Sequence, residues 1–452
     1  MPTLKAARPT VADALPAQIG RYRVLRKLGE GATSEVFLAR DDFHDREVAI
    51  KRVRASPQPD GEGGEARSRQ RFFAAEAALV GRLQHPNVVQ LLDAVSDPVA
   101  PYLVMEYVPG ITLRRHCRPD ALLPLEQIVE IGFKCAMALG YVFRQGLIHR
   151  DVKPANLLAL LERDQVVDIK VTDFGSVLNL GSDQTQIFRV GSLAYMSPEQ
   201  LDGDVLDCRA DIYSLAAVLY HLVAGRPPFD ATTQQAMMSQ IYTATAPALG
   251  GLREGVPAGL EKLIAAALAK AREDRPADWE AFAQALSALV ANGEVPRGQL
   301  QGVLDSERFT LLRSLEFFAE FGDVELWEVV HRARWQRLAF GHSLFRKGEQ
   351  GRSFHIIAQG EVEVFRDSRK VAQLGAGTSV GEMAYLAPSP ELRSHSADVV
   401  VSSPATTISF SPHTMEQLST GTRHLFDAAF IRVLVRRLHA AHESLAHPRR
   451  IL

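Results

Sequence analysis

The segment HRDVKPAN, residues 149–156, brings an acid, a lysine and an amide close together. Asp151, Lys153 and Asn156 are followed by a second acid, Asp173, which begins the tripeptide Asp-Phe-Gly. Carboxylate and amide oxygens are ligands that Mg²⁺ takes in proteins. A lysine adds a positive charge that attracts phosphate. Side chains of these types could together bind a divalent metal ion and a phosphate group.

The sequence around these residues changes from strand-like to helical patterns. Residues 20–55 alternate in the strand period with glycines between, which predicts a small antiparallel sheet. Helical periodicity dominates over 125–290, and the polar residues 291–306 are predicted to form a linker. A helical stretch to about residue 338 and short strand-like runs follow. A final helix is predicted over about 422–445.

Composition excludes several classes of protein. A length of 452 residues favours two or three domains, and 46% hydrophobic with 23% charged residues is ordinary for a globular protein. A net charge of −2 argues against a nucleic-acid binder. Residues 1–19 lack the apolar core of a signal peptide and are predicted to be a flexible tail, and no apolar run reaches the roughly 18–20 residues of a membrane span. Three scattered cysteines are typical of reduced thiols in a cytoplasmic protein: Cys117, Cys135 and Cys208.

Two further segments complete a family pattern. The glycine-rich LGEGATSEV precedes Val-Ala-Ile-Lys at 48–51, so that with HRDVKPAN and Asp-Phe-Gly the chain resembles the protein kinase family over about residues 20–290. The resemblance implies a bilobal kinase fold of the α+β class. It also implies transfer of the γ-phosphate of ATP to protein substrates, with Mg²⁺ or Mn²⁺. Lys153 resembles the Ser/Thr-specific branch of the family.

The resemblance assigns roles in phosphoryl transfer to five residues. Asp151 would accept the proton of the substrate hydroxyl, with Lys153 beside it, and Lys51 would place its charge on the α- and β-phosphates. Asn156 and Asp173 would hold the metal ion. Phosphoryl transfer depends mainly on positioning and charge neutralisation, which these side-chain types supply.

Further contacts with ATP are expected from the glycine-rich loop, the strands after it, one helix and the hinge between the lobes. The resemblance gives this set as Gly29, Gly31, Val36, Ala49, Lys51, Glu76, Glu106, Val108 and Leu158. Ser34 replaces the family's third glycine, which stiffens the loop tip.

Other residues resemble structural and regulatory parts of the family. Glu199 stands where the family has the acid of Ala-Pro-Glu, and Arg275 matches its usual ion-pair partner. Asp211 resembles the residue that anchors the catalytic loop. Arg150 implies pairing with a phosphate on the segment 176–196, where Thr185 is the candidate phosphosite. The alternative is that Thr185 is simply an exposed threonine.

The C-terminal part, residues 307–452, resembles a cyclic nucleotide-binding domain, a β-roll with flanking helices. Its expected ligand is cAMP or cGMP, and the residues that match the ligand site are Gly381, Glu382, Arg393 and Ser394. Three positions depart from the pattern: Val380 replaces an aromatic residue, Leu392 a proline and His395 a small residue. The alternative is a degenerate roll that serves docking or forms a homodimer.

A different class of function also remains open for the whole chain. It could be a pseudokinase scaffold that binds nucleotide without catalysis and presents the roll to a partner. The presence of Lys51, Asp151, Asn156 and Asp173 argues for the enzyme.

Overall fold

The computed structural model covers the whole chain, which divides into two units, residues 1–297 and 298–452. The structure describes residues 15–30, 34–53, 81, 83–97, 100–162, 165–174, 178–179, 190–295 and 305–446.

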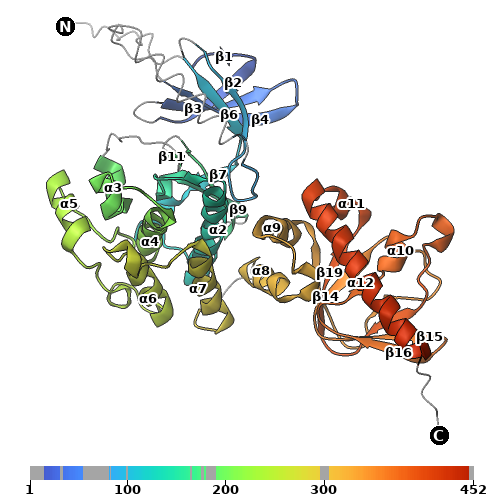
Figure 1. The fold of residues 1–452 in the computed structure, drawn as a ribbon. Coiled ribbons are helices and arrows are strands. Elements are labelled where there is room, and N and C mark those ends of the chain that lie inside the picture. Colours follow the sequence, from blue (N-terminus) through green and yellow to red (C-terminus); the bar gives the residue numbers. More distant parts are fainter. Residues whose placement is uncertain are drawn as a thin grey trace, which may run out of the picture. The chain divides into compact units, whose positions relative to one another are not determined.

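The first unit begins with a six-stranded antiparallel sheet in the order β1-β2-β3-β4-β6-β5 (Figure 1). Its strands are β1 (Gln18–Ile19), β2 (Tyr22–Glu30), β3 (Ser34–Asp41), β4 (Arg46–Val53), β5 (Leu91–Val95) and β6 (Tyr102–Glu106). Strand alternation places apolar side chains together in one core, formed by Ile19, Tyr22, Phe37, Ala39, Val48, Ile50, Tyr102 and Val104. The predicted small sheet is therefore present.

The register of this sheet positions several predicted site residues. Val36 pairs with Gly29 on β2 and with Lys51 on β4. An irregularity of the β2–β3 pairing lies next to Gly29. Ala49 pairs with Met105, so β4, which carries Lys51, lies next to β6, the strand before the expected hinge. Lys51 therefore lies on β4, one of the two central strands of the sheet.

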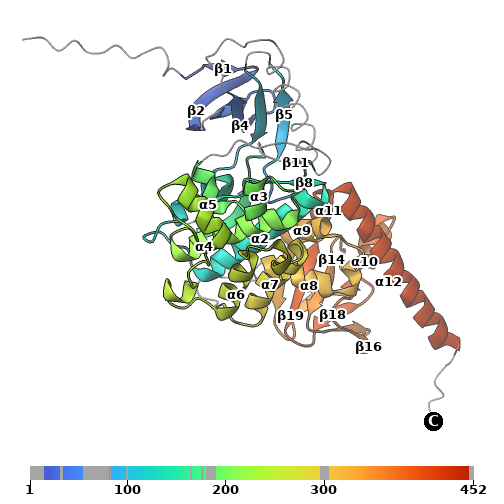
Figure 2. The ribbon, with the colours of Figure 1, turned by 60° about the vertical axis from the view of Figure 1, so that its left-hand side comes forward.

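The rest of the first unit is mainly helical. Its helices are α2 (Leu125–Arg144), α3 (Pro198–Asp202), α4 (Cys208–Ala224), α5 (Gln234–Thr243), α6 (Ala258–Ala267) and α7 (Trp279–Ala291). Figures 1 and 2 show α2 and α4 in the middle of this lobe, and α2 packs on both α4 and α7. Gly140 allows the close approach of α7, because a Cβ there would lie 3.0 Å from the Cβ of Trp279.

Short strands and turns lie between the sheet and the helices. They are β7 (Gly110–Thr112), β8 (Leu147–Ile148), β9 (Leu157–Glu162), β10 (Gln165–Val171), β11 (Leu178–Asn179) and the 3₁₀ turns η3 (Pro154–Asn156) and η4 (Val190–Tyr195). They form a three-stranded sheet β10-β9-β7 and a two-stranded sheet β11-β8. The segment 149–156 runs from β8 to η3, and Asp173 follows β10, so both acids lie at strand ends.

The second unit contains two four-stranded sheets, β12-β19-β14-β17 and β13-β18-β15-β16. Their strands are β12 (Arg334–Leu338), β13 (Ser343–Phe345), β14 (Phe354–Gln359), β15 (Val362–Arg366), β16 (Arg369–Leu374), β17 (Ser379–Val380), β18 (Asp398–Val401) and β19 (Ala405–Phe410). One core joins the two sheets: Phe345, Ile357, Val362, Val380, Val399, Val401 and Ala405. This arrangement is the predicted β-roll.

Helices flank the roll. They are α8 (Asp305–Ser314), α9 (Asp323–Arg332), α10 (Glu382–Leu386), α11 (Pro412–Glu416) and α12 (Thr420–Ala446). Aromatic rings fix α12 to the roll, since Phe426 and Phe430 contact Phe354 at ring-centroid distances of 5.9 and 4.9 Å. The final helix predicted over about 422–445 is confirmed.

One predicted boundary is wrong. The helical stretch expected to about residue 338 ends at Arg332, because Arg334–Leu338 forms β12 and pairs in register with β19. The five residues RWQRL carry no helix-terminating signal, so only this long-range pairing decides their conformation. Among the helices that the structure describes, none has the length and apolar composition of a membrane span. The fold class is α+β as predicted, and the predicted domain limits stay predictions.

Candidate active site

The backbone of the segment 149–156 is anchored by Asp211 of α4. The two carboxylate oxygens of Asp211 accept hydrogen bonds from the backbone N–H groups of His149 at 2.7 Å and Arg150 at 2.8 Å. Burial raises the pKa of Asp211. The neighbouring His149 and Arg150, whose backbone N–H groups donate to its oxygens, oppose that rise. Arg150 has a positive φ of 67°, an unfavourable conformation that these contacts hold in place. The predicted anchoring role of Asp211 is therefore present in the structure.

His149 links this loop to the strand end before Asp173. Its Nε2 lies 3.1 Å from the carbonyl oxygen of Thr172, and its Nδ1 lies 3.3 Å from the backbone N–H of Asp151. A carbonyl can only accept and an N–H can only donate, so the neutral tautomer with the proton on Nε2 satisfies both contacts. The ring also lies 5.0 Å from that of Phe174. The two acidic segments are thus held at a fixed spacing.

The Asp151 carboxylate is oriented by both polar residues of its own loop. Lys153 Nζ donates to its two oxygens at 2.8 and 2.6 Å. Asn156 Nδ2 donates to the Asp151 carbonyl oxygen at 2.8 Å and to Oδ2 at 3.0 Å. Asn156 uses its amide nitrogen in this way, which leaves its oxygen Oδ1 as the atom suited to a metal ion. The loop therefore presents one carboxylate and one amide oxygen.

Lys51 of β4 reaches across to Asp173 and forms an ion pair with its Oδ1. Asp173 has a positive φ of 65°, so its backbone turns sharply after β10. Burial alone would raise the pKa of Asp173, but the charge and hydrogen bond of Lys51 outweigh it and the pKa lies below its usual value. Asp173 is therefore an anion, available to a cation. The structure brings together Lys51, Asp151, Lys153, Asn156 and Asp173 as predicted, while their chemical roles stay predictions.

The segment after β6 carries backbone groups suited to a planar base. The N–H of Glu106 donates to the Gln90 carbonyl at 2.9 Å, and its carboxylate pairs with Lys170 at 2.7 Å. The carbonyl of Val108 accepts from Gly110 at 2.8 Å. Among the described residues, the N–H of Val108 has no hydrogen-bond acceptor, although Val108 is 7% exposed. This donor fits an adenine ring nitrogen.

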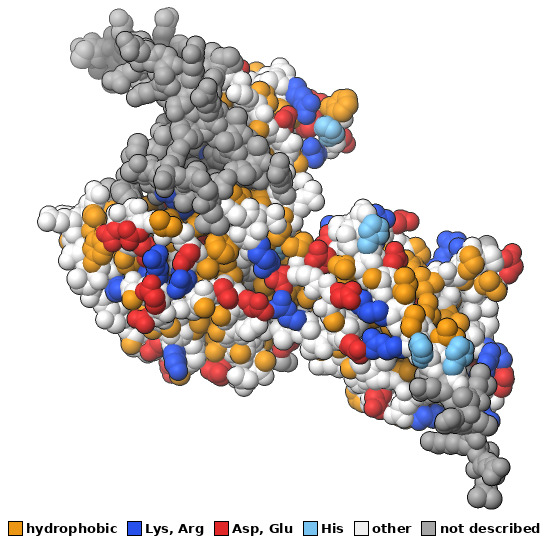
Figure 3. Space-filling model, in the orientation of Figure 1, with side chains coloured by type: hydrophobic (Ala, Val, Ile, Leu, Met, Phe, Trp, Pro, Cys, Tyr) orange, Lys and Arg blue, Asp and Glu red, His pale blue; other side chains and the backbone are white. Residues whose placement is uncertain are grey.

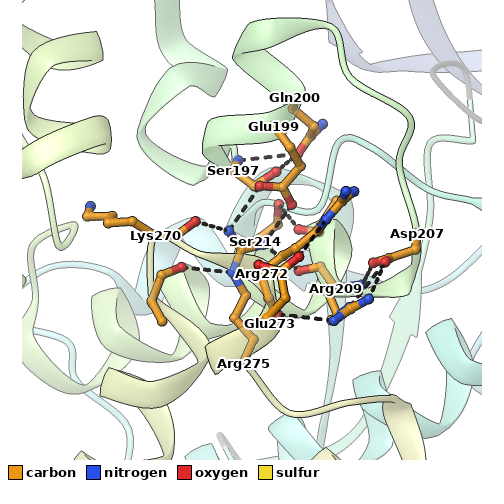
Figure 4. Close-up of polar contacts among 12 residues, drawn as sticks. Ser197, Glu199, Gln200, Asp207, Arg209, Ser214, Lys270, Arg272, Glu273 and Arg275 are labelled. Atoms are coloured by element: carbon orange, nitrogen blue, oxygen red, sulfur yellow. Dashed lines mark hydrogen bonds and ion pairs between the residues drawn. The ribbon is translucent and has the colours of Figure 1, made fainter.

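Glu199 of α3 and Arg275 form the predicted ion pair (Figure 4). Arg275 donates to the two Glu199 oxygens at 2.6 and 2.9 Å. Its remaining hydrogens go to the backbone carbonyls of Ala269, Arg209 and Lys270. The arginine is fully buried and fully bonded, which fixes α3 against the segment after α6.

Sequence reasoning missed the residue that joins this anchor to the segment 149–156. Gln200 Nε2 donates to the carbonyl oxygen of Arg150 at 2.9 Å. Gln200 also forms a capping box with Ser197 at the start of α3. The spacing Ser-Pro-Glu-Gln is the sequence signal of such a box, but nothing in it indicates the contact with Arg150.

The second unit contains the four residues expected at a nucleotide site. Gly381 has a φ of 83° and precedes α10, and Glu382 is 2% exposed. Arg437 of α12 pairs with Oε1 of Glu382 and donates to the carbonyl oxygen of Ser379 at 2.7 Å. The other carboxylate oxygen of Glu382 is buried and has no hydrogen-bond partner among the described residues. Arg437 was not expected from the sequence, because it lies far from Glu382 along the chain.

Arg393 and Ser394 lie on a segment that runs beside residues 348–351. The carbonyl of Arg393 accepts from the Gly351 N–H at 3.0 Å, and Ser394 forms a bridge with Gln350. The next residue, His395, stacks on Phe345 with ring centroids 4.0 Å apart. A Cβ at Gly351 would lie 2.0 Å from Nε2 of His395, so a glycine is required beside this bulky ring. The ring occupies the position where a small residue was expected.

Comparison with known proteins agrees with this geometry. The family profile described as the protein kinase domain matches residues 22–287, more than half of the chain. The chain belongs to the protein kinase family. The profile described as the cyclic nucleotide-binding domain matches residues 335–420 of the same kinase-family chain.

The kinase-family chain is similar to several bacterial proteins. Serine/threonine-protein kinase PknB of Mycobacterium tuberculosis is 35% identical over 304 residues, which are 65% of this chain and 46% of that protein. The Mycobacterium leprae protein of the same name is 34% identical over 304 residues, with the same coverage. Serine/threonine-protein kinase PrkC of Bacillus subtilis is 35% identical over 253 residues, 56% of this chain and 38% of that protein. The chain spans less than half the length of each of these relatives.

Three predicted residues of the kinase domain lie outside the described part of the chain. They are Gly31 of the glycine-rich loop, Glu76 as the partner of Lys51, and Thr185 as the phosphosite. Their predicted roles stay predictions. The other residues expected to contact ATP are described by the structure. Gly29, Val36, Ala49 and Glu106 lie on β2, β3, β4 and β6, Val108 follows β6, and Leu158 lies on β9.

Proposed function

We propose that the chain is an active Ser/Thr protein kinase that transfers the γ-phosphoryl group of ATP to serine or threonine hydroxyls of protein substrates. The observation that carries this proposal is the orientation of Asp151, whose carboxylate is held by Lys153 and Asn156 in the unit that also holds the Lys51–Asp173 pair. A scaffold without catalysis would not require an acid held in this way.

Asp151 accepts a hydrogen bond from the substrate hydroxyl and takes its proton as the oxygen attacks the γ-phosphorus. The new phosphorus–oxygen bond forms while the bond to the bridging oxygen of ADP breaks. Lys153, next to both carboxylate oxygens, keeps Asp151 in place and adds positive charge near the transferred group. A bound Mg²⁺ or Mn²⁺ neutralises charge on the phosphates, and the oxygens of Asn156 and Asp173 are its ligands in this proposal.

The Lys51–Asp173 contact fits this assignment. Asp173 is an anion paired with a cation, and a metal ion can replace the lysine as that cation. In the proposed complex, Lys51 would pair with the phosphates of ATP. The available N–H of Val108 and the carbonyl of Glu106 bind the adenine edge in the proposed complex.

Phosphate incorporation from radiolabelled ATP into a generic protein substrate tests the proposal. The wild-type chain is compared with Asp173→Ala and with a matched control, Asp120→Ala, whose exposed carboxylate pairs with the exposed Arg118. Incorporation by the wild type and the control, and its loss in Asp173→Ala, are expected. Equal incorporation in all three, or none in the wild type, would favour the pseudokinase scaffold.

The second proposed function is binding of a cyclic nucleotide, cAMP or cGMP, by the second unit. The buried oxygen of Glu382 that lacks a partner among the described residues supports it, because a ribose hydroxyl would satisfy this acceptor. Within the same described part of the chain, the Arg393 guanidinium forms no ion pair, which supports a role in binding the cyclic phosphate.

Titration calorimetry of the full chain with cAMP and with cGMP tests this second function. Arg393→Ala is expected to weaken binding by about 10- to 100-fold, the effect of one hydrogen-bonded charge. Arg369→Ala, an exposed arginine on β16, is the matched control. The absence of heat with either nucleotide would favour the degenerate roll, and ATP turnover with and without the nucleotide would test coupling to the kinase domain.

A further inference from the structure

Helix α12 carries a stripe of exposed apolar side chains in its middle part. Ile431, Leu434, Val435 and Leu438 are 62, 39, 47 and 57% exposed. Their spacing of three and four residues places them on one face of the helix. Figure 3 shows apolar side chains gathered over α12 and the neighbouring α10. We call these four residues the α12 stripe.

The α12 stripe is not the face that joins the helix to its own roll. Phe426 and Phe430 make that contact and are buried. Arg432 and Arg436, on another face, pair with Glu320 and Glu316. The helix is therefore held on the roll by aromatic and ionic contacts that leave the stripe uncovered. A contiguous apolar patch of this kind marks an interaction surface.

The spacing of the stripe suits an identical helix. Apolar residues at intervals of three and four form the seam of paired helices, in which the side chains of each helix fit between those of the other. In an antiparallel pair centred between Leu434 and Val435, Leu434 of one copy lies level with Val435 of the other. Ile431 then lies level with Leu438 of the second copy. All four residues of the stripe are then covered.

The charges at the ends of the stripe favour the antiparallel direction. Asp427 and His442 are both exposed, one on each side of the stripe along the helix. In a parallel pair, Asp427 would face Asp427 of the second copy, and two like charges in the seam repel. In the antiparallel pair, Asp427 lies level with His442 of the second copy, which is a complementary contact.

We propose that two copies of this chain associate through their α12 helices in an antiparallel pair, with the α12 stripe as the centre of the interface. Met383 and Leu386 of α10 are 64 and 39% exposed, and α10 adjoins α12 through the Glu382–Arg437 ion pair. The polar groups at the rim are Asp427 and His442. The proposal does not depend on catalysis or on nucleotide binding.

Sedimentation velocity of the full chain over a wide range of protein concentration tests the association. A dimer that dissociates on dilution is expected for the wild type. Leu434→Glu is expected to weaken association by about 100-fold or more, because it places two carboxylates in an apolar seam. The matched control is Val371→Glu, also an exposed apolar residue of the second unit but on β16, which should dimerise as the wild type does. Circular dichroism confirms that both variants are folded.

The direction of pairing is tested by disulfide cross-linking under mild oxidation. The three native cysteines are buried, so introduced thiols react first. A mixture of Asp427→Cys and His442→Cys chains is expected to form a cross-linked heterodimer, whereas Asp427→Cys alone does not cross-link. Efficient cross-linking of Asp427→Cys to itself would overturn the antiparallel pair. A wild-type monomer at all concentrations, or a dimer unaffected by Leu434→Glu, would overturn the proposal itself.

Discussion

Arg275 binds Glu199 through two hydrogen bonds, and the arginine side chain is completely inaccessible to solvent. When one partner of a buried ion pair is removed, the remaining charge has neither an opposite charge nor water around it, which destabilises the folded state. This relationship makes the pair a determinant of stability in the first unit, unlike the exposed ion pairs of the same lobe.

Removal of the buried arginine gives the first prediction. Arg275→Ala is expected to lower the free energy of unfolding of the first unit by about 3–5 kcal/mol, because the Glu199 carboxylate remains buried and unpaired. Arg118→Ala breaks an exposed pair with Asp120 and should cost less than about 1 kcal/mol. Urea denaturation of the two variants measures the difference. Equal losses would contradict the assignment of the Glu199 pair as a buried anchor.

A second prediction concerns Asp151. Asp151→Asn keeps the shape of the side chain and its contact with Asn156 but removes the proton acceptor. We expect kcat to fall by about 100- to 10,000-fold, the usual contribution of general base catalysis. The KM for ATP should change little, since Asp151 is assigned to the hydroxyl and not to the nucleotide. Steady-state kinetics with a peptide substrate separates the two constants, and an unchanged kcat would exclude Asp151 as the base.

The third prediction is a pH dependence of the second unit. His355 is buried between the two sheets, where desolvation and then the nearby His395 lower its pKa to about 4. In the unfolded chain this imidazole binds a proton near the ordinary histidine pKa of 6.5, whereas the folded imidazole does not bind it until about pH 4. Stability of the second unit should therefore fall as the pH decreases from 6.5 towards 4, by up to about 1.4 kcal/mol for each pH unit.

His355→Gln tests this relationship, because a glutamine does not titrate in this range. The variant should lose a large part of the decrease in stability between pH 6.5 and 4, as measured by thermal unfolding at a series of pH values. His395 has a pKa that burial also lowers, so a smaller decrease remains. Parallel curves for the variant and the wild type would show that His355 is not the source.

The fourth prediction separates two neighbouring arginines of α12. Arg437→Ala leaves the buried carboxylate of Glu382 without its ion pair, and should destabilise the second unit by about 1–3 kcal/mol. Arg436→Ala removes a contact with the exposed Glu316 and should cost less than about 1 kcal/mol. Adding Glu382→Gln to Arg437→Ala should recover part of the loss, because a neutral amide is less costly to bury. Denaturant unfolding of the single and double variants completes the cycle.

The extent to which the sequence predicted the site depended on how far apart the interacting residues are. Asp151, Lys153 and Asn156 lie within one short loop, so their spacing already indicated that they act together. The contacts of Lys51 with Asp173 and of Glu199 with Arg275 join distant segments, and a resemblance to a family was needed to expect these residues near one site or as a pair.

Other long-range contacts had no such signal. Arg437 is one of several arginines on α12, and only the packing of that helix on the roll brings it to Glu382. Gln200 was not expected to bind the Arg150 carbonyl, because its visible role was to cap α3. β12 was predicted as helix because its pairing with β19 is formed by residues far along the chain. Local patterns specify local conformation, and these contacts are set by tertiary packing.

The attachment of the segment 149–156 to Asp211 has a consequence for hydrogen exchange. The amides of His149 and Arg150 are bonded to a side chain of α4, and almost all residues of that helix are buried. These two amides can exchange with solvent only when their bonds to the buried Asp211 carboxylate open, so we expect their exchange to be slow. The backbone before Asp151 is therefore expected to resist local unfolding as strongly as the buried core of its lobe.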